Sequence, residues 1–145
     1  MKKVVLGLDL DGVVIDLTYL EKKVSGRHLC EEDIELAHPR LLPPVLGVRR
    51  VLKSRVVEAI VTKRTKRRPV EKWFTYWFGG LVVPVYCIGP SGDKAEKCKE
   101  LGITVFVDDD YFMAAHLKSY GILGLWFTVK KDKDLYEFLK RKGVL

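Results

Sequence analysis

The stretch "VVLGLDLDGVV", residues 4–14, is an apolar run that ends in two acids. It stays apolar until Asp9, then places a second carboxylate at Asp11 and a glycine at Gly12. A buried strand has no structural use for two acids, and a surface turn needs no such apolar run before it. The two acids are therefore candidate functional residues, and the rest of the chain must supply their partners.

Composition indicates one globular domain. The chain has 145 residues, of which 48% are hydrophobic and 31% charged, enough for a single core and unlike a disordered chain. No apolar stretch approaches the roughly 20 residues that span a bilayer, and the two acids interrupt any signal-peptide core. Three cysteines without metal-type spacing predict reduced thiols. We expect a cytoplasmic protein with no membrane partner.

Charge narrows the class of partner. The formal net charge of +7 predicts an anionic partner, which could be a phosphate, a nucleotide or a nucleic acid. The chain contains no Asn and no Gln and is rich in Lys, Arg and Glu, which is typical of thermophile proteins. A zinc ion shared by His28, Cys30 and His38 is a weaker alternative.

Apolar runs alternate with helical patterns along the chain. The runs lack polar alternation, as in parallel strands that are covered on both faces, and they span residues 3–9, 56–61, 82–88, 103–107 and 122–128. Helices are expected at residues 70–78, 94–101, 112–120 and 135–142. This order predicts a single domain, residues 1–145, folded as a three-layer α/β/α Rossmann-like sandwich with a mostly parallel sheet.

Trp73 and Trp77 share helical spacing with Val70, Phe74 and Phe78, which favours a place in the core over base stacking.

Residues 16–45 are polar, contain three prolines and follow the acidic turn directly. This segment is too short for a domain, so we interpret it as a small cap-like insertion, partly helical, near the mouth of the site.

Polar residues end three of the predicted strands. Ligands of parallel α/β sheets bind outside the carboxyl ends of the strands, so these residues should converge. They are Asp9 and Asp11 after the first strand, Thr62, Lys63 and Arg64 after the second, and Asp108, Asp109 and Asp110 after the fourth. Such an acidic cluster needs a cation, and Mg²⁺ suits oxygen ligands best.

Lys94 is a further candidate. Asp93 reads as the N-cap of a helix, which puts Lys94 in the first turn, where the helix dipole disfavours a cation. A lysine there is well placed for an anion or a carboxylate cluster, although an ordinary surface lysine fits this helix equally well.

Together these motifs resemble the haloacid dehalogenase (HAD) superfamily of phosphohydrolases. The four motifs stand in the family's order over nearly the whole chain: "DLDGV" at 9–13, "VT" ending at Thr62, Lys94, and "VDDD" at 107–110. A calcium-binding EF-hand does not fit, because its glycine belongs at loop position six and a glutamate at position twelve.

The resemblance implies a mechanism. Asp9 would attack phosphorus to form an aspartyl-phosphate, and Asp11 would protonate the leaving oxygen and later activate water. An extended chain between them would put both side chains on one side. Mg²⁺ would be held by Asp9, the Asp11 backbone carbonyl and Asp108, with Asp109 acting near the metal. Asp110 is expected to cap the following helix.

The phosphate group would contact residues of the second and third motifs. Thr62 would hydrogen-bond the transferring phosphoryl group, Arg64 would lie beside it, and Lys94 would neutralise developing charge. Lys63 would add positive charge at the rim. Whether the rest of the basic run, residues 66–68, binds substrate or forms a solvated face stays open.

The substrate is less determined. "VTKRTKRRPVEKWFTYWFGGL", residues 61–81, looks like the second-motif region of small HAD 5′-nucleotidases and polynucleotide phosphatases. We expect a small phosphorylated substrate, with a nucleotide favoured over a nucleic-acid end. A non-catalytic basic module that binds nucleic acid or protein is the alternative from another class. With so small a cap, a homodimer could also cover the site.

Overall fold

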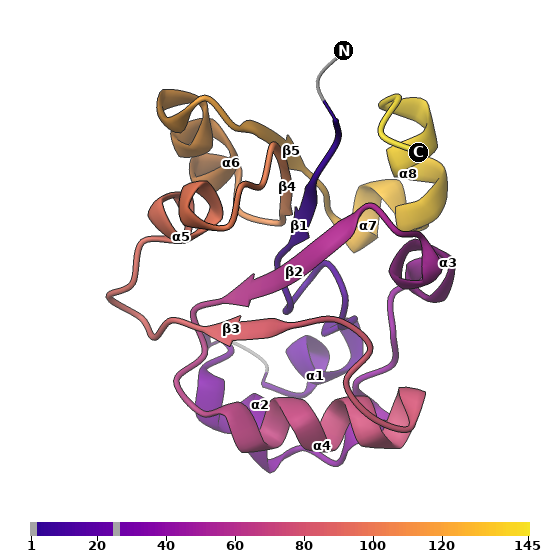
Figure 1. Ribbon diagram of the computed structural model, residues 1–145. Coiled ribbons are helices and arrows are strands. Elements are labelled where there is room, and N and C mark those ends of the chain that lie inside the picture. The colour runs from indigo at the N-terminus through magenta and orange to yellow at the C-terminus, as the bar shows by residue number, and fades with distance from the viewer. Residues whose placement is uncertain (1–2, 25–26) are drawn as a thin grey trace.

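The computed structural model describes residues 3–24 and 27–145, which are built around a five-stranded sheet (Figure 1). The strand order is β3-β2-β1-β4-β5, and every neighbouring pair is parallel. The strands are β1 Leu6–Leu8, β2 Val57–Thr62, β3 Val85–Cys87, β4 Val105–Asp108 and β5 Leu123–Trp126. Each overlaps one predicted apolar run, and the predicted α/β class with a parallel sheet is confirmed.

Helices connect the strands and extend past the last one. They are α1 Thr18–Lys23, α2 Glu31–Leu36, the 3₁₀ helix η1 Pro39–Leu41, α3 Val48–Lys53, α4 Arg67–Phe78, α5 Lys94–Glu100, α6 Tyr111–Leu117, the 3₁₀ helix η2 Lys118–Tyr120, α7 Val129–Asp132 and α8 Leu135–Arg141. The four predicted helices correspond to α4, α5, α6 with η2, and α8. The short helices α3 and α7 were not predicted, because six and four residues give too little periodicity to recognise.

The sheet is covered on both faces, which makes three layers. Leu8 and Val107 pack with α3, α4 and α8 in one buried cluster, whereas Val61 and Phe106 pack with α5 and α6 in another. Neighbouring residues of a strand thus enter different cores, which explains why the strands lack polar alternation. A Cβ atom on Gly7 would lie 2.7 Å from side-chain atoms of Ile103 and Phe106, so glycine is required there.

Helix α4 fixes residues 16–45 against the body of the molecule. Trp73 is almost fully buried and its indole N–H donates to the Leu42 carbonyl (2.6 Å). Trp77 is half-buried and donates in the same way to the Pro39 carbonyl (2.9 Å). Both indoles therefore serve packing, as predicted. In Figure 1, α1 and α2 lie on the same side of β3 as α4.

The segment 16–45 is partly helical, as expected, since it carries α1, α2 and η1. Residues 25–26 within it lie outside the described part of the chain. Its interpretation as a cap-like insertion rests on its place beside the site, which is described next.

Candidate active site

Two of the predicted acids meet where β1 and β4 end. These strands are paired in register, with Leu8 opposite Val107, so Asp9 and Asp108 follow at the same level. The Asp9 backbone N–H donates to the Val107 carbonyl (2.9 Å). From β1 the chain builds the sheet first in one direction, through β2 and β3, and then in the other, through β4 and β5. Ligands of open α/β sheets bind at such a switch point.

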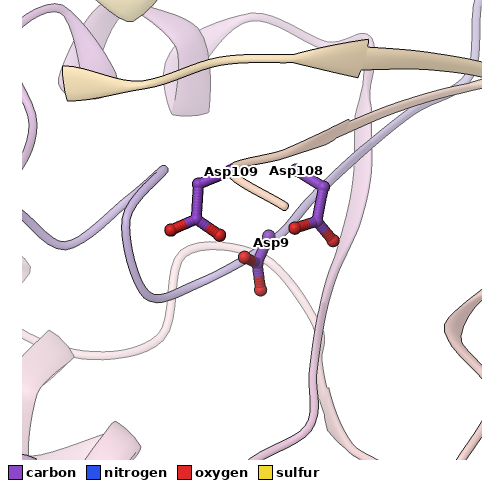
Figure 2. A group of neighbouring side chains, drawn as sticks. All are labelled: Asp9, Asp108 and Asp109. Atoms are coloured by element: carbon purple, nitrogen blue, oxygen red, sulfur yellow. The ribbon is translucent and has the colours of Figure 1, made fainter. Parts of the chain in front are cut away.

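Asp109 completes a cluster of three carboxylates. Oxygen atoms of Asp9, Asp108 and Asp109 all lie within 4.8 Å of one another, and Figure 2 shows the three side chains converging. In the described part of the chain this is the one such group of three or more metal-ligating side chains. His28, Cys30 and His38 form no comparable group there, so the structure gives the zinc alternative no support.

Lys94 is buried in this cluster rather than exposed on its helix. Its ammonium group lies 2.7 Å from Asp9 Oδ1 and 3.0 Å from Asp108 Oδ2. Burial alone would lower the pKa of Lys94, but the two carboxylates outweigh it and raise that pKa. The helix begins as predicted, because the Asp93 side chain accepts a hydrogen bond from Ala95 N (2.9 Å).

The charges of the cluster match a divalent cation. Three carboxylates and one ammonium leave two negative charges uncompensated. Desolvation by burial raises the pKa of Asp9 well above its ordinary value, although Lys94 opposes this. The carboxyl group of Asp109 faces the other acids, and desolvation raises its pKa to about 6 (Figure 2). Crowded carboxylate oxygens of this kind are the donors that Mg²⁺ prefers, so the residues present fit the ion.

The raised pKa values predict how Mg²⁺ stabilises the protein at different pH. Without metal, protonated Asp109 favours the folded state at low pH, and this contribution is lost as the pH rises through its raised pKa of about 6. The pKa of Asp9 is also raised, so its protonation acts in the same direction. Mg²⁺ must displace these protons, so a fixed concentration should raise Tm more at about pH 7.5 than at about pH 5. Thermal melts with Mg²⁺ and with EDTA measure both shifts. A Mg²⁺-induced rise in Tm that is equal or larger at about pH 5 would contradict a Mg²⁺ site at these carboxylates.

Gly12 makes room for Asp109. Its φ of +86° lies in the left-handed region, and a Cβ atom there would overlap the Asp109 carboxylate. We predict that Gly12→Ala costs about 1–2 kcal/mol of folding stability from backbone strain alone. It should also weaken Mg²⁺ binding, because the carboxylate must move. Urea unfolding and a Mg²⁺ titration measure the two effects; Gly121→Ala, at a similar φ of +74° but with no atom within 4 Å of the added Cβ, is the control that should lower stability only.

Asp11 lies apart from the three acids and pairs with Arg64. The guanidinium group donates from Nε to Asp11 Oδ2 (2.8 Å) and from Nη2 to Oδ1 (2.6 Å). Burial alone would lower the pKa of Arg64, but the Asp11 carboxylate outweighs it, so that pKa is raised. The expected extended chain from Asp9 to Asp11 is wrong, because the backbone bends at Leu10, whose carbonyl accepts from Val14 N (2.9 Å). Sequence alone does not reveal this bend.

The predicted phosphate-binding residues surround one pocket of about 450 Å³. Thr62 ends β2, is buried, and accepts a hydrogen bond from Arg64 N on its hydroxyl (3.2 Å). Lys63 is exposed at the wall. The ends of β1, β2 and β4 and the start of α5 bring the predicted lining residues together: Asp9, Asp11, Thr62, Lys63, Arg64, Asp109 and Lys94. Asp108 lies behind them, held by Lys94.

Sequence reasoning expected residues 16–45 near the mouth of the site but named none of the residues that form the other wall of the pocket. This wall comes from residues 16–45 and consists of Leu17, Glu21, Leu29, Glu31 and Ile34. Glu31 also ties this wall to the loop after β2, because its carboxylate accepts from Thr65 N (2.5 Å) and the Thr65 hydroxyl (3.3 Å). The one available signal was the position of the segment directly after the acidic turn.

Asp110 has the separate role that was predicted for it. Its side chain accepts a hydrogen bond from Phe112 N (2.9 Å) and caps α6. The remaining two acids of "VDDD" therefore belong to the cluster, and the third to the helix.

Comparisons with known proteins identify the fold. No protein-family model matches the sequence, and no curated protein matches it either. A HAD family enzyme from Bacteroides thetaiotaomicron, solved as a magnesium complex, matches the structure with a TM-score of 0.60 and 17% sequence identity. The match covers 97% of this chain and 100% of that one. The chain therefore has the HAD-like fold that its motifs predicted. Among its described helices, none has the length and apolarity to cross a membrane.

Proposed function

We propose that this protein is a Mg²⁺-dependent phosphatase that hydrolyses phosphate monoesters through Asp9. The observation that carries the proposal is the position of this carboxylate. It is buried beside Lys94 (2.7 Å), clustered with Asp108 and Asp109, and open to a pocket at the carboxyl edge of the sheet. The HAD-like fold supports the same reading by analogy.

Asp9 would act as the nucleophile. Its Oδ1 accepts hydrogen bonds from Leu10 N (2.9 Å) and Lys94 Nζ (2.7 Å), which fix the orientation of the carboxylate. A carboxylate oxygen attacks phosphorus, the bond between phosphorus and the leaving oxygen breaks, and an aspartyl-phosphate forms. Water then attacks this phosphorus, which releases inorganic phosphate and regenerates Asp9.

Asp11 would move the protons. Protonated, it gives its proton to the leaving oxygen; as the carboxylate, it takes a proton from the attacking water. It lines the same pocket as Asp9. Both of its oxygens accept hydrogen bonds from the Arg64 guanidinium group, a pairing that favours the carboxylate form, so Asp11 would act as an acid only after Arg64 turns from it toward the phosphate.

The other residues would balance charge and position the phosphate. Bound Mg²⁺, held by Asp9, Asp108 and Asp109 with the Asp11 backbone carbonyl, would supply compensation for the phosphate charge. Lys94 offsets the repulsion between the Asp9 and Asp108 carboxylates. It would also stabilise the negative charge that develops on the phosphoryl group during the reaction. Thr62 would donate its hydroxyl proton to a phosphoryl oxygen, and exposed Lys63 would attract the anion.

A nucleotide is the substrate that we favour for this pocket. Its volume of about 450 Å³ is in the usual range for small ligands. Leu17, Leu29 and Ile34 give the wall from residues 16–45 an apolar part, beside Glu21 and Glu31, which suits a base or sugar. The phosphate would face Lys63 and Thr62.

Phosphate release from a substrate panel tests this function. The panel contains 5′- and 3′-mononucleotides, sugar phosphates and p-nitrophenyl phosphate, each with Mg²⁺ and with EDTA. We expect release with Mg²⁺, none with EDTA, and the highest kcat/KM for a mononucleotide among these small substrates. No release across temperatures up to those of thermophiles would overturn the proposal and favour a non-catalytic basic binding module.

A further inference from the structure

A second pocket adjoins the first. It also has a volume of about 450 Å³ and lies where α2 and η1 face the start of α4. Ile34 and Arg64 line both pockets, so the two pockets are neighbours. A substrate that occupies both would cross the boundary that these two buried side chains form.

The two sides of this pocket differ in chemistry. Its floor is apolar and is formed by Ile34, Ala37, Pro39, Leu42 and Trp73. Its rim is basic and is formed by the exposed residues Lys66, Arg68 and Lys72. The one acid at this pocket, Glu35, lies 3.7 Å from the ammonium group of Lys66. Among residues 3–24 and 27–145, no acid forms an ion pair with Arg68 or Lys72.

We propose that this pocket binds the second nucleotide unit of an oligonucleotide whose terminal phosphate is hydrolysed at Asp9. The inference rests on the proposed phosphatase function and names its substrate class. The base or sugar of the second unit would lie on the apolar floor. The phosphodiester that joins the two units would face Arg68 and Lys72, which supply the charge that phosphate contacts need.

Charge complementarity favours an oligonucleotide over a mononucleotide, and it favours extension into the second pocket over extension toward the opposite side of the site. A mononucleotide has no phosphate other than the one at Asp9, so it leaves the basic rim of the second pocket without a partner. On the opposite side of the site, a third pocket contains Lys22, Lys130 and Lys133, but Asp16 and Glu21 compensate two of these three charges. A polyanionic strand is therefore directed toward Arg68 and Lys72 rather than toward that side.

The test compares substrates that differ by one nucleotide unit. They are thymidine 5′- and 3′-monophosphate, thymidine dinucleotides with a terminal 5′- or 3′-phosphate, and thymidine 3′,5′-bisphosphate. For wild type, we expect kcat/KM for the better dinucleotide to exceed that of its mononucleotide by about tenfold, as one charge-assisted phosphate contact would give. Equal values would overturn the inference. So would a bisphosphate as good as the dinucleotide, because the second nucleoside would then contribute nothing.

A charge-matched pair of variants locates the effect. Lys72→Glu should reduce the preference for the dinucleotide toward unity and flatten its dependence on salt. Lys99→Glu makes the same change of charge on the exposed face of α5, which packs on the other face of the sheet. It should leave the preference intact. If both variants lose the preference equally, the second pocket is not its cause and the inference fails.

A binding measurement keeps the inference testable if the phosphatase proposal itself fails. Fluorescence anisotropy with a labelled, phosphorylated thymidine oligonucleotide requires no turnover. Binding to wild type that is weakened by Lys72→Glu and not by Lys99→Glu supports the pocket even without hydrolysis. Binding that does not distinguish the two variants, or no binding, overturns it.

Discussion

Asp9→Asn is expected to reduce kcat for phosphate release by on the order of 10⁴-fold or more, since loss of an enzyme's nucleophile has effects of this size. The amide has nearly the shape of the carboxylate and can still accept the hydrogen bond from Lys94, so the protein should fold. It cannot attack phosphorus as a carboxylate does. Steady-state phosphate release with Mg²⁺, on the best mononucleotide, measures the loss.

Asp110→Asn is the matched control for this variant. It makes the same chemical change one residue beyond the acidic cluster, at the N-cap of α6, where Asn is as good a cap as Asp. Activity should stay close to that of wild type. If Asp9→Asn also retained activity within about tenfold of wild type, Asp9 would not be the nucleophile and the proposed chemistry would be wrong.

Lys94→Met should have the largest effect on stability. In the metal-free protein it removes the ammonium group shared by two buried carboxylates, at 2.7 and 3.0 Å. Breaking a buried ion pair by removing one partner costs about 3–5 kcal/mol. We therefore expect a loss of this size in the free energy of unfolding at neutral pH with EDTA, measured by urea denaturation. Activity should fall as well, because the charge beside the phosphate is lost.

The pH dependence of this loss gives a second test. Lys94 opposes the rise in the pKa of Asp9, so without it Asp9 binds its proton more tightly in the folded state, and this protonation stabilises the variant at low pH. The deficit relative to wild type should therefore shrink as the pH falls below neutral. Lys99→Met, at an exposed position of the same helix, should show neither effect. A Lys94→Met variant as stable as wild type at every pH would mean that the contact contributes nothing.

The ends of the strands explain why much of the site could be predicted from sequence. A parallel sheet brings the carboxyl ends of its strands to one edge, so Asp9, Thr62 and Asp108 had to lie near one another once the apolar runs were recognised. The N-cap at Asp93 then fixed where α5 begins and thus where Lys94 projects. A lysine in the first turn of a helix is disfavoured by the helix dipole, which marked Lys94 as a candidate from sequence. The structure explains its position, because Lys94 contacts Asp9 after β1 and Asp108 at the end of β4.

Other features depend on tertiary contacts that leave no local pattern. The pairing of Arg64 with Asp11 joins residues 53 positions apart, and neither shows it in its own neighbourhood. The wall formed by α1 and α2 comes from helices of six residues each, too short for a clear period. Glu31 begins a run of three acids in which nothing local distinguishes it, yet its carboxylate accepts a hydrogen bond from the Thr65 backbone N–H.

Trapping the covalent intermediate at Asp9 tests the central claim most directly. Wild-type protein with Mg²⁺ and its best phosphomonoester would be quenched during turnover and treated with borohydride, which reduces an aspartyl-phosphate to homoserine. Mass spectrometry of the peptide containing residues 4–14 then shows whether position 9 holds homoserine or aspartate. Homoserine at this position, absent from the Asp9→Asn variant, is the predicted result. Phosphate release with an unmodified Asp9, or homoserine at another aspartate, would contradict the account.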